Sequence, residues 1–155
     1  MADATYSPKI YKKSGGNEMV VASGGTITVE SGGAIATPGG SSLLDTVLHL
    51  DIADGSAEAV YFLTSPIAGT ISKIYTVIDD VVSTADITVT GKIGATAITS
   101  GVVTIATAAS AAGDVDVATP TAANVITAGA AMNFTVAGGG AGGAPRIHLA
   151  VVITR

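Results

Sequence analysis

The sequence predicts an all-β protein, a single β-sandwich preceded by an extended Gly-rich N-terminal arm. Charged residues make up only 12% of the 155-residue chain, against about 25% in a typical soluble domain. Ala, Gly, Thr, Val and Ile dominate instead, a mixture that favours strands and turns over helices. Apolar residues alternate in short runs, with turn signals every 8 to 12 residues or so, which is typical of a sandwich of about seven or eight strands.

The first 40 residues form an arm rather than a domain. Pro8 and the cluster Ser14-Gly15-Gly16-Asn17 interrupt any helix, and Ser-Gly-Gly recurs at 14–16, 23–25 and 31–33. The segments between these units, 18–21 and 26–30, are each one strand long. Such a ribbon is too short to bury its own apolar face. We expect it to pack on the main domain, on a sister subunit or on a larger partner.

The body comprises residues 41–155, after a linker at 37–42. The predicted strands are 44–52, 58–64, 70–78, 86–93, 102–105, 132–136 and 147–153, with a further short strand within 106–118. The third and the last are apolar on both faces, which predicts central positions. Residues 119–124 carry the capping and proline pattern of a single helical turn. Long connections at 106–123 and 138–145 favour a jelly roll, and the Cys and Trp of immunoglobulin domains are absent.

Charge is unevenly placed along the chain. Residues 1–20 carry Lys9, Lys12 and Lys13 against Asp3 and Glu18, a balance of +1, and the rest carries four basic and ten acidic residues, a balance of −6. A basic arm on an acidic body suits an acidic protein surface better than nucleic acid, which requires a broad basic face. We expect no nucleic-acid partner. The uncharged runs are too rich in Thr, Ser, Gly and Pro for a membrane span, and the first residues lack a signal peptide's apolar core, which predicts synthesis in the cytoplasm.

No constellation of residues predicts catalysis or a cofactor. His49 and His148 fall on predicted strands, and although Asp45 and Asp51 share the face of His49, no metal-ligand spacing is present. We expect these histidines to be solvated or hydrogen-bonded. The aspartates at 51–55 and 79–80 lack the ligand count of a calcium loop and are expected in turns. There is no Gly-x-Ser-x-Gly elbow, no phosphate-binding Gly-Lys-Ser/Thr, no Cys and no Trp.

Residues 11–33, YKKSGGNEMVVASGGTITVESGG, resemble the N-terminal segment of head-decoration (cement or head-fibre) proteins of tailed bacteriophages. In those proteins an aromatic and basic start leads into a Gly-Gly pattern of this kind. The Ala/Thr/Gly-rich body from 62 to 155, including 66–71 and 120–124, is similar in style to the β-domains that follow.

This resemblance implies a non-enzymatic virion protein on the exterior of the capsid. Its partners would be the major capsid protein and two sister copies in a homotrimer, with no cofactor and no metal. The arm would contact the shell, and the residues proposed to do so are Tyr6, Tyr11, Lys12, Lys13, Ile27 and Val29. For residues 10–13 a solvated tail remains the alternative interpretation.

A second class of function is a fibre-tip or adhesin-type sandwich that binds host-surface glycans. The loop at 138–143, with five glycines, is the feature that suggests it. Sugar sites use surface aromatics, and this chain has four Tyr, two Phe and no Trp. Capsid decoration is therefore the preferred hypothesis.

Overall fold

The computed structural model describes residues 10–12, 19–28, 45–140 and 145–155, and they form eleven strands and no helix. There is accordingly no helix among them that could cross a membrane. The strands are β1 (Ile10–Lys12), β2 (Met19–Val21), β3 (Thr46–Ile52), β4 (Ala59–Thr64), β5 (Gly69–Ile78), β6 (Ile87–Ile93), β7 (Thr96–Ile105), β8 (Val115–Ala118), β9 (Val125–Ile126), β10 (Ala131–Gly138) and β11 (Ile147–Thr154).

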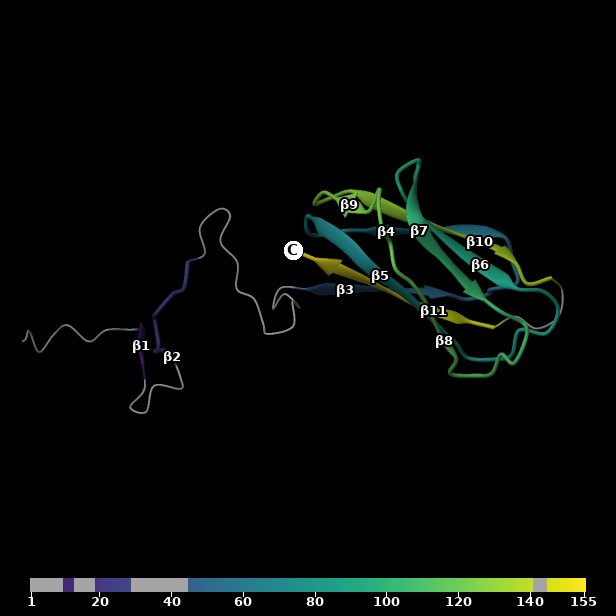
Figure 1. The fold of residues 1–155 in the computed structure, drawn as a ribbon, viewed down its shortest axis with the longest axis horizontal. Helices are drawn as coiled ribbons and strands as arrows, with labels where there is room; N and C mark the ends of the chain where they lie inside the picture. The colour runs from purple at the N-terminus through teal and green to yellow at the C-terminus, as the bar shows by residue number, and fades with distance from the viewer. Residues whose placement is uncertain (1–9, 13–18, 29–44, 141–144) are drawn as a thin grey trace, which may run out of the picture.

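Residues 45 onward form two antiparallel sheets that face each other, as Figure 1 shows. One sheet has the order β3-β11-β5-β8, with β9 also paired to β5, and the other has the order β4-β10-β6-β7. The pairing is nested: β3 pairs with β11, β4 with β10, β5 with β8 and β6 with β7. The predicted all-β sandwich is confirmed.

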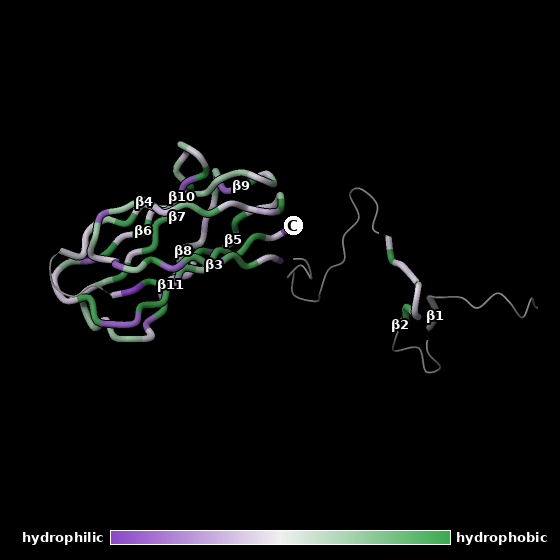
Figure 2. Tube along the Cα trace, turned by 180° about the vertical axis from the view of Figure 1, so that it is seen from behind, coloured by the Kyte–Doolittle hydropathy of each residue, from purple (hydrophilic) through white to green (hydrophobic). Residues whose placement is uncertain are grey.

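The core lies between the sheets and is filled by the inward-facing residues of alternating strands. β11 shows the pattern well, since Ile147, Leu149, Val151 and Ile153 are buried and their neighbours are not. Figure 2 shows the apolar positions of the strands. The sheets approach closely at Gly91 of β6, where an added Cβ would lie 3.2 Å from the Ile74 side chain of the opposite sheet. A side chain at this position would have to displace that packing.

The predicted central strands are central. β11 lies between β3 and β5, and β5 lies between β11 on one side and β8 and β9 on the other. The half-buried alternation predicted for residues 44–52 is found in β3, where Leu48 and Leu50 face inward and His49 and Asp51 outward.

The helical turn predicted at 119–124 is wrong. Ala122 instead forms an antiparallel bridge with Thr99 of β7, and the Asn124 side-chain amide donates a 2.9 Å hydrogen bond to the Ile71 carbonyl. Ala123 takes a φ of +52°, outside the right-handed helical region. The segment runs beside two strands whose backbone groups need partners, and this tertiary pairing outweighs the local capping pattern.

β7 begins six residues earlier than predicted. A two-residue turn, Gly94-Ala95, joins it to β6, and Ile93 pairs directly with Thr96. Gly94 has a φ of +58° and Ala95 is not among the residues with positive φ, the pattern of a type II′ hairpin turn. The turn therefore extends the hairpin into residues 96–101, whose Thr, Ala, Ser and Gly give a weak strand signal.

Two glycines with positive φ provide a test of how tightly the loops are held. Gly138, with a φ of +89°, has no room for a Cβ because the Asp86 carbonyl oxygen occupies the place, whereas Gly94 faces open space. Left-handed backbone costs a non-glycine residue about 1–2 kcal/mol, and overpacking adds about 1–3 kcal/mol. We expect Gly94→Ala to lower the free energy of unfolding by about 1 kcal/mol and Gly138→Ala by about 2–4 kcal/mol. Urea unfolding measures both, and equal losses would contradict the packing described for Gly138.

Candidate partner-binding surfaces

The N-terminal ribbon consists of β1 and β2, which pair antiparallel with Tyr11 opposite Val20 and Lys12 opposite Met19. β2 agrees with the predicted strand at 18–21, whereas the sequence showed no strand at residues 10–12. β1 is three residues long, and β2 supplies the pairing partners of its backbone. Neither strand pairs with any other strand in the described part of the chain. A lone hairpin of this size is marginal in water, so this ribbon needs a further surface to be stable.

A tight turn follows β2. The Gly25 amide donates a 2.8 Å hydrogen bond to the Ala22 carbonyl, and Gly24 has a φ of +75°. Glycine at the third position of such a turn is what a type II turn requires. The second Ser-Gly-Gly unit is therefore a chain reversal, as its composition predicted.

The strand predicted at 26–30 is not formed over the residues that are described, Thr26 to Thr28. Strand-type sequence needs a neighbouring backbone to pair with, and none among the described residues lies beside this segment. The Ile27 side chain is 49% exposed. Ile27 is therefore an exposed apolar residue on a segment that pairs with no described strand.

The structure places three of the six residues proposed for shell contact. Tyr11 and Lys12 lie on β1, and Ile27 lies beyond the turn that follows β2. Tyr6, Lys13 and Val29 lie outside the described residues. The three that are placed belong to the ribbon and the segment directly after it.

The body carries most of its carboxylates at one end. At this end, the loops that follow β3, β5 and β7 lie close to the segment that leads into β11. Backbone hydrogen bonds join them, from Gly55 to Pro145, from Asp79 to Arg146 and from Ile78 to Asp114. We name this end the acidic end. Its carboxylates are Asp51, Asp54, Glu58, Asp79, Asp80, Asp86, Asp114 and Asp116.

Arg146 is the single cation of the described residues at the acidic end, while Lys73, Lys92 and Arg155 lie toward the opposite end, where Asp45 leads into β3. The sequence shows the net charge but not this segregation, which depends on which loops the nested topology brings together.

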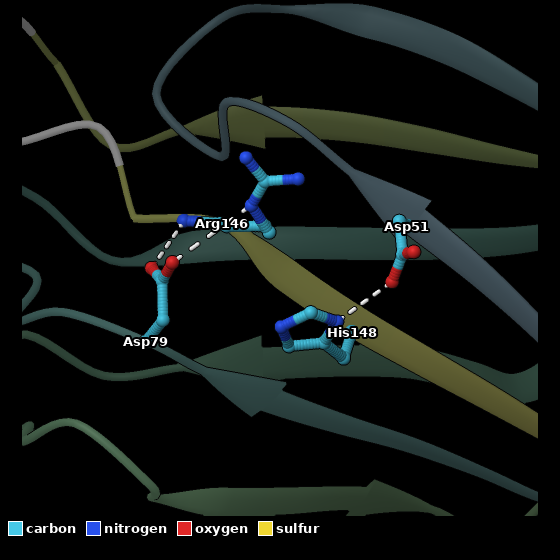
Figure 3. A network of polar contacts seen from close by, with 4 residues as sticks. All are labelled: Asp51, Asp79, Arg146 and His148. Atoms are coloured by element: carbon cyan, nitrogen blue, oxygen red, sulfur yellow. Dashed lines mark hydrogen bonds and ion pairs between the residues drawn. The ribbon is translucent and has the colours of Figure 1, made fainter.

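Two cross-strand pairs lie on the outer surface near the acidic end (Figure 3). His148 and Asp51 face each other in register, with Nδ1 2.6 Å from the carboxylate oxygen. The Asp79 carboxylate accepts a 2.7 Å hydrogen bond from the Arg146 backbone amide and lies 3.9 Å from its guanidinium. All four side chains are about half exposed or more. His148 is hydrogen-bonded, as predicted, and no group of three or more potential metal ligands is found among the described residues.

Other carboxylates fix loops. Asp54 accepts hydrogen bonds from the amide and the hydroxyl of Ser56, and these bonds lower the pKa of Asp54. Asp86 accepts bonds from the amide and the hydroxyl of Thr107, at 2.8 and 2.9 Å, which lower the pKa of Asp86. The turn role predicted for the aspartates of 51–55 is confirmed at Asp54.

Asp116 differs from these capping residues. Desolvation by burial is the larger cause that raises the pKa of Asp116, and repulsion from the Asp114 charge is the smaller one. It sits opposite Thr76, whose buried hydroxyl has no hydrogen-bond partner. On the inward side of the β5–β8 pair, the Thr76 hydroxyl is therefore a buried polar group that the fold does not satisfy.

Comparison with known proteins gives no further identification: no family model, no curated protein and no solved structure matches the chain.

The pKa values of Asp86 and Asp116 are shifted in opposite directions, so replacing each aspartate by asparagine is expected to change the stability of the fold in opposite directions. A carboxylate with a lowered pKa stabilises the fold above its ordinary value of 3.8, and this contribution is lost as the pH falls through the lowered pKa. A carboxylate with a raised pKa instead destabilises the fold at neutral pH, because its charged form is disfavoured in the folded state. This destabilisation disappears below the ordinary pKa value of 3.8. We expect Asp86→Asn to reduce the unfolding free energy at pH 7 and Asp116→Asn to increase it.

Thermal unfolding between pH 7 and pH 3 measures both effects. The two differences from wild type should shrink toward zero as the pH approaches the acid limit. A loss at Asp116→Asn comparable to that at Asp86→Asn would contradict the assigned environment of Asp116.

Proposed function

We propose that this chain is a non-enzymatic structural protein of a tailed phage that binds the outer surface of the capsid and stabilises it by bridging neighbouring major capsid proteins. The observation that carries the proposal is the ribbon of β1 and β2. It is paired only with itself among the described strands and continues into the segment Thr26–Thr28, on which Ile27 is exposed. Strand edges and exposed apolar residues of this kind are completed by another chain through β-augmentation.

We infer further that the sandwich is a jelly roll. The nested order, in which the first strand of the body pairs with the last and the second with the next to last, supports this description. Consecutive strands of such a roll lie in opposite sheets except for the central hairpin, which is β6 and β7 here. β9 is then a short addition to the edge of β5.

Orientation follows from charge and connectivity. The chain enters the body at Asp45, directly before β3, at the end away from the acidic end. An arm attached there leads to the shell, and the acidic end points outward into solvent. Net charge on the outer end favours solubility of the decorated particle.

The stabilising mechanism is multivalent. Each arm contributes a small interface, and several arms joined in one oligomer raise one another's effective concentration at the shell. Many modest contacts across capsomer seams then resist the outward load of packaged DNA without any single strong site.

Shell binding can be tested with heads of the phage that encodes the chain, stripped of decoration and mixed with purified protein. Deletion of residues 1–40 is expected to abolish co-sedimentation with the heads. In the full chain, Ile27→Asp is expected to weaken binding at least about tenfold, since a charge buried at an apolar contact costs well over 1.4 kcal/mol. Val125→Asp is the matched control, because Val125 is an exposed residue of the body.

Full decoration by the truncated body, or equal losses for Ile27→Asp and Val125→Asp, would overturn the role given to the arm. A glycan array tests the adhesin alternative with the same protein. Against that alternative, Gly138 to Gly140 pack on Asp86, Ser56 and Thr84, so the described part of this loop is already in contact with the body.

A further inference from the structure

The two long sides of the sandwich differ. On one side β7 and β8 contact each other across the sheets, and residues 119–124 run beside them. Thr121 donates to the Thr99 carbonyl and Thr99 donates to Ala122. The inward residues of this side are buried, with Ile98 3% exposed and Ala118 5% exposed. We call this the closed side.

The other side is formed by β3 and β4, and among the described strands each pairs on one edge only, with β11 and β10 respectively. Their inward residues Leu48, Leu50, Tyr61 and Leu63 pack against the core but remain only partly buried. β3 and β4 make no set of mutual contacts comparable to that of β7 with β8. We call this the open side, where an apolar seam lies between two unpaired strand edges.

β4 carries none of the features that protect an edge strand. Its sequence, AVYFLT, has no charged residue, no Pro and no Gly, and its pairing with β10 has no register shift. On its outer face Val60 is 49% exposed and Phe62 is 67% exposed. Natural sheets guard such edges with charge, bulges or covering segments, and an unguarded apolar edge pairs with another strand. β7, the other edge of this sheet, is also uncharged, but residues 119–124 cover part of it.

Strand direction identifies an occupant. β3 and β4 are consecutive and run in opposite directions along the open side, β3 toward the acidic end and β4 away from it. When two copies stand side by side with their long axes parallel, β4 of one copy is therefore antiparallel to β3 of the next. This pairing uses both free edges of every copy, and it brings the apolar seams of the copies together.

Charge supports pairing between β4 and β3 rather than between two β3 strands. The outer face of β3 carries Asp51, with Asp45 just before the strand, and two β3 edges would place four carboxylates along one junction. β4 has no charge to oppose them. Like charges across a strand pair destabilise it, and uncharged partners do not.

We propose that copies of this chain associate through the open side, with the β4 edge of each copy adding to the β3 edge of the next in a closed, parallel ring. Each sheet then continues into the opposite sheet of the neighbouring copy. All chains enter their bodies at the same end of the assembly, because Asp45 lies at the same end in every copy. This inference requires no shell and goes beyond the proposed function.

The solution mass of the full chain tests the proposal. Wild type at tens of micromolar is expected to show a light-scattering mass of two or three times the 15.0 kDa chain. Val60→Glu with Phe62→Glu places charge beside Asp45 and Asp51 of the neighbour and is expected to weaken association at least tenfold and shift the mass to that of one chain.

The matched control is Val102→Glu. Val102 lies in the same cross-strand row as Val60, through Thr135 and Thr90, and is 45% exposed on the opposite edge strand. It should retain the wild-type mass. Circular dichroism verifies that all variants keep the fold. A monomeric wild type, or equal dissociation by the Val102 variant, would overturn the proposal.

The pairing itself can be tested by cross-linking, since the chain has no cysteine. Val47→Cys and Phe62→Cys place single thiols on the outer faces of β3 and β4. An oxidised mixture of the two variants is expected to give covalent pairs, and Phe62→Cys alone is expected to give none. Pairs from Phe62→Cys alone would show β4 against β4 and overturn the parallel ring. A wild-type monomer that still bound to heads would overturn this inference and leave the proposed function in place. A wild-type ring that did not bind to heads would overturn the proposed function and leave this inference in place.

Discussion

The structure depends on the place of β11, the last strand of the chain. It pairs along its length with β3 on one side and β5 on the other, and alternate residues from Ile147 to Ile153 are buried. Among the described strands β3 pairs with β11 alone, so without β11 it would lose that pairing. Because these contacts join opposite ends of the body, this sheet is complete only when both ends of the body are present, which makes the sandwich cooperative and slow to nucleate.

The backbone's need for partners explains the remaining features. At the closed side, residues 119–124 give up helical geometry to bridge Thr99 and bond Ile71. At the open side and in the ribbon, this need is unmet within the described part of one chain. Both places combine free edges with exposed apolar residues, Phe62 in one and Ile27 in the other. The proposed association of this chain with other chains therefore depends on these strand edges and exposed apolar residues rather than on a polar site.

The period-2 pattern was sufficient to predict the sheets, since strands such as β10 and β11 bury alternate residues strongly. It failed where pairing, not pattern, determines structure, as at Ala122 and in β1, which pairs with β2 over three residues. The Gly94-Ala95 turn carried a readable signal, a glycine at the first position of a two-residue hairpin loop. The acidic end and the open side could not be predicted, because they depend on which loops and edges the topology places together.

In the proposed parallel ring, the placement of charge determines how strongly electrostatic repulsion opposes the burial of apolar side chains. Parallel copies bring their acidic ends near one another, which opposes association, but carboxylates such as Asp54 and Asp86 are exposed, and exposed charges more than about 8 Å apart are largely screened at physiological salt. Full burial of a Leu or similar side chain is worth about 1.5–3 kcal/mol. Leu48, Leu50 and Leu63 already pack against the core, so completing their burial contributes the smaller part of that range for each. Because the charges are gathered at the end and β4 has none, the apolar term acts along the side where the repulsion is weakest. The proposed self-association of an acidic chain thus depends on the separation of charge and apolar edge in one small domain.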